Sequence, residues 1–89
     1  MINVSIVTYL TPLEDVINVV STCSNSLLVK NIFVIDNSPD DVLCKVLPSE
    51  DKVKYIHNPS NPGYGAAHNI AFKKSLLQDI PFHLVLNAD

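Results

Sequence analysis

Four short apolar runs, each separated from the next by a segment with helical signals, constrain the fold of this chain more than any other feature. The runs are Val4–Thr8, Ile32–Asp36, Val53–His57 and Phe82–Asn87. The first, second and fourth are nearly continuous rather than alternating, which is typical of central strands in a parallel sheet. Strands that alternate with helices favour a parallel sheet with right-handed crossovers. The pattern therefore predicts a three-layer α/β fold, with about four parallel strands and helices on both faces.

The best-marked helix follows the first run. Thr11 is its predicted cap, Pro12 its first helical position, and Glu14 lies three residues after the cap. Apolar residues then recur with a period of about 3.6 residues, at Leu13, Val16, Ile17, Val20 and Cys23. The short polar side chains of residues 24–26 compete for the backbone and predict the end of this helix.

Two further helices are predicted. The weaker one runs from Pro39 to about Leu47, with Ser38 as its cap, Asp40 and Asp41 in its first turn, and Pro48 ending it. The other follows a turn-rich loop over residues 57–65 and ends where residues 79–81 (Asp-Ile-Pro) break the helix before the last run. Its expected apolar stripe consists of Ala66, Ala67, Ile70, Ala71, Leu76 and Leu77.

Composition limits the possible functions. The 89 residues are 47% hydrophobic, which suits one small folded domain over residues 1–89 and argues against disorder. The net charge is −3 and the basic residues do not cluster, so a nucleic-acid-binding face is not expected. No apolar run is long enough to span a membrane, and the start of the chain lacks the basic region of a signal peptide. Cys23 and Cys44 are expected to be reduced, buried thiols in a cytoplasmic protein.

Polar side chains follow every apolar run at the point where it ends. They are Thr8 and Tyr9, then Asp36, Asn37 and Ser38, then the Asn- and Gly-rich loop, and finally Asn87 and Asp89. In open parallel sheets, ligands bind beyond the carboxyl ends of the strands. Four polar ends on one rim therefore favour a binding site, although Asp, Asn and Ser also follow strands simply because they make turns and cap helices.

Individual residues on this rim leave alternatives open. Asp36 can cap the next helix or accept hydrogen bonds from a ribose or a base. Gly63 and Gly65 fail the dinucleotide fingerprint because His68 stands where its third glycine belongs, so a nicotinamide cofactor is disfavoured. The two glycines let the backbone approach a ligand or start a helix tightly. Spacing alone favours a surface or capping role for His68 and does not decide whether Asn69 binds the backbone or a ligand.

Taken in order, these segments resemble the inverting family 2 glycosyltransferases of the GT-A fold, a partial Rossmann-like fold in this chain. The resemblance is closest to the bacterial rhamnosyltransferase-like branch that builds polysaccharides and O-antigen. The stretches that carry it are VSIVTY (residues 4–9), IFVIDNS (32–38), NPGYGAAHNIA (61–71) and LVLNAD (84–89). The resemblance implies a nucleotide-diphosphate sugar as the ligand, and a location in the cytoplasm or at the inner face of the bacterial membrane.

The resemblance also implies roles for residues. Thr8 and Tyr9 would line the nucleotide pocket, Asp36 would accept from the base, and Asn37 would belong to the same donor site. Asn61, Gly63, Gly65 and Asn69 would border the base and ribose. Asn87 would also belong to the donor site. Asp89 would bind the Mg²⁺ or Mn²⁺ ion that bridges the diphosphate in the complete enzyme, and would hold it weakly or not at all in residues 1–89 alone. Such an ion needs only one or two protein carboxylates, because phosphate and water oxygens complete its coordination.

Two departures from the family pattern matter. Leu10 stands where the family usually has Asn, and Asn87 replaces the first acidic residue of the metal motif. The family's acceptor-binding half and its general base are expected beyond residue 89, so this nucleotide-binding portion is expected to be inactive alone. The alternatives are a non-catalytic α/β module that forms a homodimer through an exposed sheet edge and a nucleotidyltransferase-like domain. The second is disfavoured because no Gly-rich, basic loop follows the first run.

Overall fold

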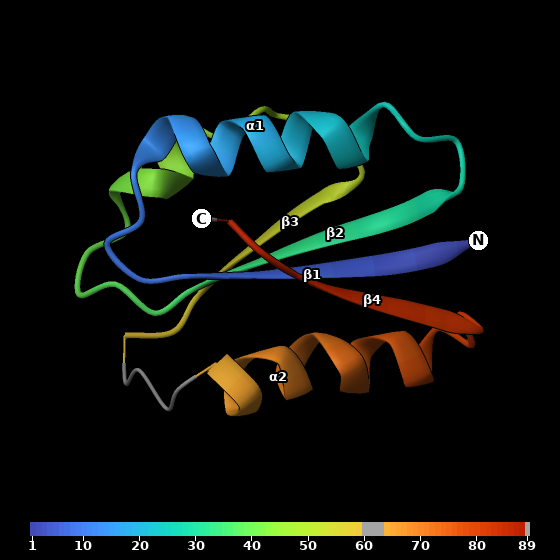
Figure 1. Ribbon diagram of the computed structural model, residues 1–89. Helices are drawn as coiled ribbons and strands as arrows, with labels where there is room; N and C mark the ends of the chain where they lie inside the picture. The colour runs from blue at the N-terminus through green and yellow to red at the C-terminus, as the bar shows by residue number, and fades with distance from the viewer. Residues whose placement is uncertain (60–63, 89) are drawn as a thin grey trace.

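The computed structural model describes residues 1–59 and 64–88, which form three layers (Figure 1). The strands are β1 (Ile2–Thr8), β2 (Val29–Asp36), β3 (Val53–His57) and β4 (Phe82–Asn87). The helices are α1 (Leu13–Ser24) and α2 (Tyr64–Leu77), and η1 (Val42–Lys45) is a short 3₁₀ helix. Since α1 covers one face of the sheet and α2 the other, the predicted α/β fold with helices on both faces is confirmed.

The sheet is parallel throughout, with the strand order β3-β2-β1-β4. After β3 the chain crosses the sheet through α2 and adds β4 on the other side of β1 (Figure 1). The strand order therefore reverses between β1 and β4, which is where doubly wound sheets bind their ligands. Thr8 pairs with Asp36, and Val7 pairs with Asn87. The register thus brings the polar ends of β1, β2 and β4 to one rim, at the left of Figure 1.

Each face of the sheet buries its own apolar cluster. On the α1 side, alternate residues of β1 and β2 pack against Val16 and Val20 of the helix. On the α2 side, Phe33 and Ile35 of β2 pack against two alanines of the helix. β2 is therefore buried on both faces, as its continuous apolar run predicts.

β4 differs from the prediction of a central strand. Among the described residues only β1 pairs with it, so β4 lies at an edge of the sheet. Phe82, Leu84 and Val85 are 67%, 45% and 53% exposed. The prediction was wrong because an apolar run indicates burial but does not name the neighbour that supplies it.

The start of α1 also differs from the predicted cap. Pro12 is the N-cap, and no side chain makes a capping hydrogen bond, so the Thr11 cap is wrong. The hydroxyl of Thr11 instead accepts a hydrogen bond from the backbone N–H of Tyr9 at 3.2 Å. The helix ends at Ser24, as predicted. The ammonium group of Lys52 donates to the carbonyls of residues 24 and 26 at 3.2 and 2.9 Å, which suits the negative end of the helix.

The helix predicted from Pro39 to Leu47 is wrong, since only the 3₁₀ turn η1 forms there. Two side chains that were expected to support this helix act locally instead. The hydroxyl of Ser38 accepts from the N–H of Leu10 at 2.8 Å, and the carboxylate of Asp40 accepts from the N–H of Val42 at 3.3 Å. Short polar side chains offer the backbone such alternatives, and a short helix without a buried face does not outcompete them.

α2 buries a narrower stripe than predicted. Ala67 and Ala71 are fully buried and Ile70 is partly buried, whereas the other three predicted residues, Ala66, Leu76 and Leu77, are exposed. The buried line continues at Ser75, four residues after Ala71, because neighbouring turns place residues four apart on one face.

α2 stops where the sequence predicts. Asp79 adopts a left-handed φ of 57°. The N–H groups of Asp79 and Ile80 donate to the carbonyls of Leu76 and Ser75, both at 3.2 Å, which satisfies the free carbonyls of the last turn.

Both cysteines are free, as predicted. Cys23 is buried, and burial raises the pKa of its thiol. Cys44 is exposed, so its predicted burial is wrong: it lies on η1, which has no buried face. None of the described helices is long and apolar enough to cross a bilayer.

Candidate functional site

Asp36 is the centre of the polar rim. It ends β2, is 1% exposed, and lies between Thr8 on β1 and the loop that follows β2. Its Oδ1 accepts from the hydroxyl of Thr8 at 3.1 Å and from the N–H of Ser38 at 3.0 Å. Its Oδ2 accepts from the phenol of Tyr55 on β3 at 2.7 Å. Three strands therefore hold one carboxylate in place.

These hydrogen bonds decide the charge of Asp36. Burial alone would raise the pKa of this carboxyl, but the hydrogen bonds from Tyr55, Ser38 and Thr8 outweigh burial and hold the pKa below its ordinary value. The same contact acts in the opposite sense on its partner, because burial and the nearby carboxylate both raise the pKa of Tyr55. Asp36 is thus a fixed, ionised acceptor beside a neutral phenol.

The loop after Asp36 is held to its neighbours through the backbone. The N–H of Asn37 donates to the carbonyl of Thr8 at 2.8 Å, and the ring Nε2–H of His57 donates to the carbonyl of Ser38 at 2.9 Å. The side chain of Asn37, 2% exposed, accepts from the amide of Asn58 at 2.9 Å. It therefore faces the β3 side of the loop.

A cavity of about 210 Å³ opens beside the carboxylate of Asp36. The ends of β1 and β2 supply its polar wall, and the loop after β1 with α1 and η1 supplies its apolar wall. The lining residues are Thr8, Leu10, Thr11, Leu13, Asp36, Ser38, Asp40, Val42 and Leu43. The volume lies below the range of about 300–1,000 Å³ that is common for drug-sized ligands, so the cavity suits one ring system rather than a whole nucleotide sugar.

The charge of the cavity also favours a ring system over a phosphate group. Two of its lining residues, Asp36 and Asp40, carry carboxylates, and none is a Lys or Arg. A phosphate group would be repelled here, whereas a base or ribose offers N–H or O–H donors to a carboxylate. The arrangement is thus chemically suited to the uncharged end of a nucleotide.

The structure brings together only some of the predicted site residues. Thr8 and Asp36 share the cavity, while the side chain of Tyr9 is 44% exposed just outside its lining. Gly65 and Asn69 lie on the first turns of α2, exposed and outside the cavity. Asn87 lies at the end of β4 and lines a separate hollow of about 350 Å³ against α1, together with Asp15 and Asn18. The predictions for Asn61, Gly63 and Asp89 lie outside the described residues.

Two residues of the cluster were not predicted as site residues. Tyr55 lies inside the third apolar run, and only the strand register, which pairs it with Val34, places its phenol near the end of β2. Ser38 is among the polar residues of the predicted rim, but the sequence assigns it only the role of a helix cap and no contact with a ligand. Sequence alternation could have placed Tyr55 on a face, but it could not have supplied the register.

A four-stranded parallel sheet with this strand order and with helices on both faces defines the class of doubly wound α/β domains, which bind ligands at the carboxyl rim. Comparison with known families is more specific. The model of the family described as glycosyl transferase family 2 matches residues 4–89, and the chain belongs to this family. Neither the curated proteins nor the solved structures contain a significant match.

Proposed function

We propose that this chain is the donor-binding portion of a glycosyltransferase that takes a sugar from a nucleotide-diphosphate sugar. The observation that carries the proposal is the ionised, triply hydrogen-bonded Asp36 at the cavity beyond β1 and β2. A fixed carboxylate recognises the N–H groups of a base, and an acceptor that is already held in place loses little conformational entropy on binding. The family match over residues 4–89 supports a nucleotide sugar rather than a free nucleotide as the ligand.

The diphosphate and sugar would extend from the cavity along the rim toward β4. The cavity lacks a basic side chain of its own, so the charge of the diphosphate favours a divalent cation as a partner. Oxygen ligands of the kind that Mg²⁺ and Mn²⁺ prefer stand at that end of the rim, in the hollow lined by Asp15, Asn18 and Asn87. In this proposal Asn87 and Asp89 would bind the cation, and the cation would neutralise charge on the leaving diphosphate.

The finer parts of the proposal rest on the resemblance. The acceptor would be a growing polysaccharide of the O-antigen type, and the protein would work in the cytoplasm or at the inner face of the membrane. The acceptor site and general base would lie outside residues 1–89. This portion would therefore bind the donor without transferring its sugar.

Calorimetric titration with UDP-, dTDP- and GDP-sugars, each with and without Mn²⁺, tests the donor site. We expect one of the three to bind, more tightly with Mn²⁺. Asp36→Asn keeps the shape of the side chain and should weaken that binding about tenfold or more, since a hydrogen bond to a charged group contributes about 1.5–3 kcal/mol. The control is Asp51→Asn, an exposed carboxylate that lines a hollow with Met1 and Leu27 and lies outside the Asp36 cavity. A folded wild-type protein that binds none of the three sugars contradicts the proposal.

A second candidate function is a module that pairs with another copy through β4. The observation in its favour is that β4 is an edge strand among the described residues and contains no charged residue or proline. The opposite edge, β3, carries Lys54, exposed on its surface. Natural sheets protect their edges with charged residues of this kind, and β4 lacks that protection. The two candidates are compatible, because the edge and the Asp36 cavity are separate surfaces.

A further inference from the structure

A line of buried polar side chains lies between β1 and α2, beside the apolar cluster that packs the rest of this face. On β1, Asn3 and Ser5 are 0% exposed and face α2, whereas Val4 and Ile6 on the other face lie in the apolar cluster under α1. On α2, Ser75 is 2% exposed. Burying polar groups is costly unless they are hydrogen-bonded, so their partners should explain why they are there.

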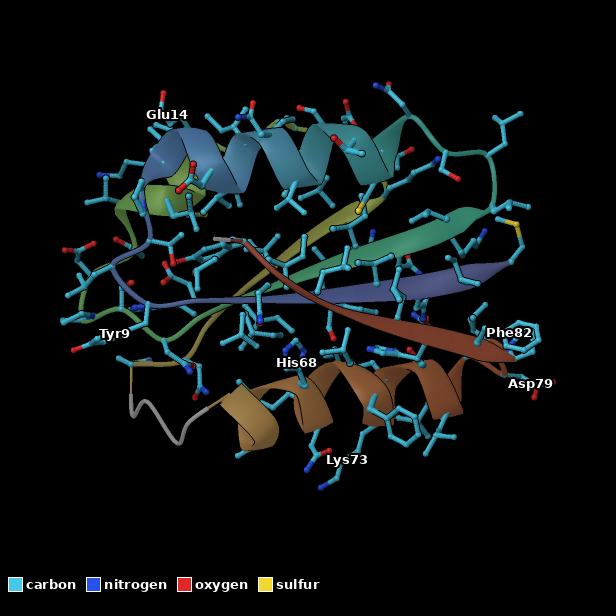
Figure 2. All side chains as sticks on the ribbon, in the orientation of Figure 1. Tyr9, Glu14, His68, Lys73, Asp79 and Phe82 are labelled. Atoms are coloured by element: carbon cyan, nitrogen blue, oxygen red, sulfur yellow. The ribbon has the colours of Figure 1, made fainter. Side chains whose placement is uncertain are left out.

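The partners form one continuous chain of hydrogen bonds through three elements. The amide of Asn3 donates to the hydroxyl of Ser75 at 2.8 Å, and that hydroxyl lies 2.7 Å from Nδ1 of His83 on β4. Nε2 of the same imidazole lies 2.9 Å from the hydroxyl of Ser5. That hydroxyl in turn lies 2.6 Å from Nδ1 of His68 on α2. Figure 2 shows His68 pointing from α2 toward the sheet.

The direction of the chain follows from counting protons. The NH₂ group of Asn3 can only donate, so Ser75 accepts from it and has its own hydrogen left for Nδ1 of His83. His83 then carries its proton on Nε2 and donates to Ser5, which donates to Nδ1 of His68. This order leaves one group unmatched, the Nε2–H of His68, whereas the reverse order would leave two, the hydroxyl hydrogen of Ser75 and the Nε2 lone pair of His68. Both imidazoles are therefore neutral Nε2–H tautomers.

Within the described part of the protein, the chain of hydrogen bonds contains no carboxylate that could balance the charge of a protonated imidazole. The groups that face His68 are His83 from β4 and the hydroxyl of Ser5 from β1, and the ring of Phe72 packs edge-on against His83. Burial lowers the pKa of both imidazoles, and His83 lowers that of His68 further. Nε2 of His68 is buried without a hydrogen-bond partner. With the first proton on Nε2, a second proton on this ring would go to Nδ1, where it would meet the hydroxyl hydrogen that Ser5 donates.

We propose that this chain of hydrogen bonds positions α2. It holds the helix on the sheet in one register while both imidazoles are neutral, and so fixes Gly65 and Asn69 on the donor side of the rim. Two apolar surfaces can slide past each other at little cost, whereas each donor in this chain fits a single acceptor. A protonated His83 would donate from both nitrogens and would clash with the hydroxyl hydrogen of Ser75. Acid would therefore release the first turns of α2. The inferred effect on donor binding rests on the proposed function, whereas the inferred positioning of α2 does not.

The tautomers are measured directly on the complete chain by ¹⁵N NMR of the imidazole rings. At about pH 7.5, above the ordinary His pKa of about 6.5, both rings should carry the proton on Nε2 and none on Nδ1. As the pH falls below that value, the amide signals of residues 65–69 should move together with the two ring signals. A proton on Nδ1 of either ring, or amide signals that ignore the titration, would overturn the proposal.

Substitutions separate positioning from simple packing. Ser5→Ala removes the central link and should shift the amide signals of residues 65–69 already at neutral pH. Ser26→Ala, which also deletes a hydroxyl that accepts one hydrogen bond, should leave these signals unchanged. His68→Asn retains an acceptor near the position of Nδ1 and should keep the wild-type signals, whereas His68→Leu should not. Equal spectra for His68→Asn and His68→Leu, or an unshifted Ser5→Ala, would contradict the positioning role.

The donor titration is then repeated with Ser5→Ala, and with the wild type at about pH 7.5 and at a pH below the midpoint of the ring titration measured by NMR, which should lie below the ordinary His pKa. Affinity should fall roughly fivefold or more in both cases, a usual size for coupling between sites. Asp36 does not account for such a loss, because its pKa lies below the ordinary Asp value. Unchanged affinity in Ser5→Ala overturns the link to the donor. Absence of donor binding in the wild type contradicts the proposed function, and the NMR result still decides the role of the chain.

Discussion

Leu10, the second residue after β1, adopts a backbone conformation that its side chain disfavours. Its φ is 50°, in the left-handed region, and the side chain is 65% exposed. The N–H of Leu10 donates to the hydroxyl of Ser38, and this bond holds the turn against the end of β2. A left-handed conformation costs an ordinary residue about 1–2 kcal/mol, whereas Asn is several times more common there. Strain of this kind often lies at binding sites, and Leu10 lines the Asp36 cavity.

Leu10→Asn should therefore stabilise the protein, by up to about 1 kcal/mol. In a domain of this size that raises the melting temperature by roughly 4–8 °C. Leu28→Asn is the matched control, since Leu28 is 67% exposed and its φ is not positive. Thermal unfolding followed by circular dichroism measures both variants. If the two leucine substitutions change the melting temperature equally, relief of strain at Leu10 is not the cause.

Residue types and their order located much of the site, and the register located the rest. A carboxylate that directly follows an apolar strand indicated Asp36, and the rule for parallel sheets placed it beside Thr8. The position of the Tyr55 phenol against Asp36 and of the Asn37 side chain against Asn58 depends on which residues pair across strands. Pairing is set by packing over the whole sheet, and local sequence does not contain it.

At the scale of elements, all four strands and two of the three predicted helices exist where the sequence places them. Where the predictions of helix starts fail, two local hydrogen-bonding arrangements compete for the same side chains. Thr11 bonds to a nearby N–H rather than capping α1, and Asp40 and Ser38 bind turn N–H groups rather than starting a helix. Propensity gives the same residues good scores in both arrangements, so it does not separate a capping box from a turn.

Gly65 in α2 gives a prediction for an element. An added Cβ there would meet nothing within 4 Å, so the packing of the described residues does not require a glycine. Gly65→Ala should stabilise the protein by about 0.5–1 kcal/mol, since glycine is a poor helix former. The donor titration should meanwhile show weaker binding, because the methyl group would occupy space that the proposal gives to the ligand.

The control for Gly65→Ala is Ala66→Gly, on the next exposed position of the same turn. It should destabilise the protein by a similar amount and leave donor affinity unchanged. A Gly65→Ala protein that is more stable and binds the donor as tightly as the wild type would show that nothing approaches this face of α2.

At the scale of the whole molecule, the layers and their order follow from the alternation of strands and helices, and the exposure of β4 does not. A continuous apolar run indicates that a strand is buried in the functional protein, but it does not identify the residues that cover the strand. The described residues bury β2 on both faces and leave most of β4 exposed to solvent. The apolar side chains of β4 are therefore free to pack against another surface. Phe82, at one end of this edge, lies near the end of α2 in Figure 2.

If that neighbour is a second copy, the chain should form dimers that depend on its concentration. Val85→Lys should abolish them, because a charged residue on an edge strand opposes pairing with another edge. Val85 is already 53% exposed, so the lysine should leave the stability of the monomer nearly unchanged. Leu27→Lys adds the same charge in a loop, on a residue that is 90% exposed, and should leave the dimer intact. Sedimentation velocity over a range of concentrations distinguishes these outcomes. A wild-type chain that sediments as a monomer throughout, or a Val85→Lys protein that dimerises as the wild type does, would assign the open edge of β4 to a different neighbour.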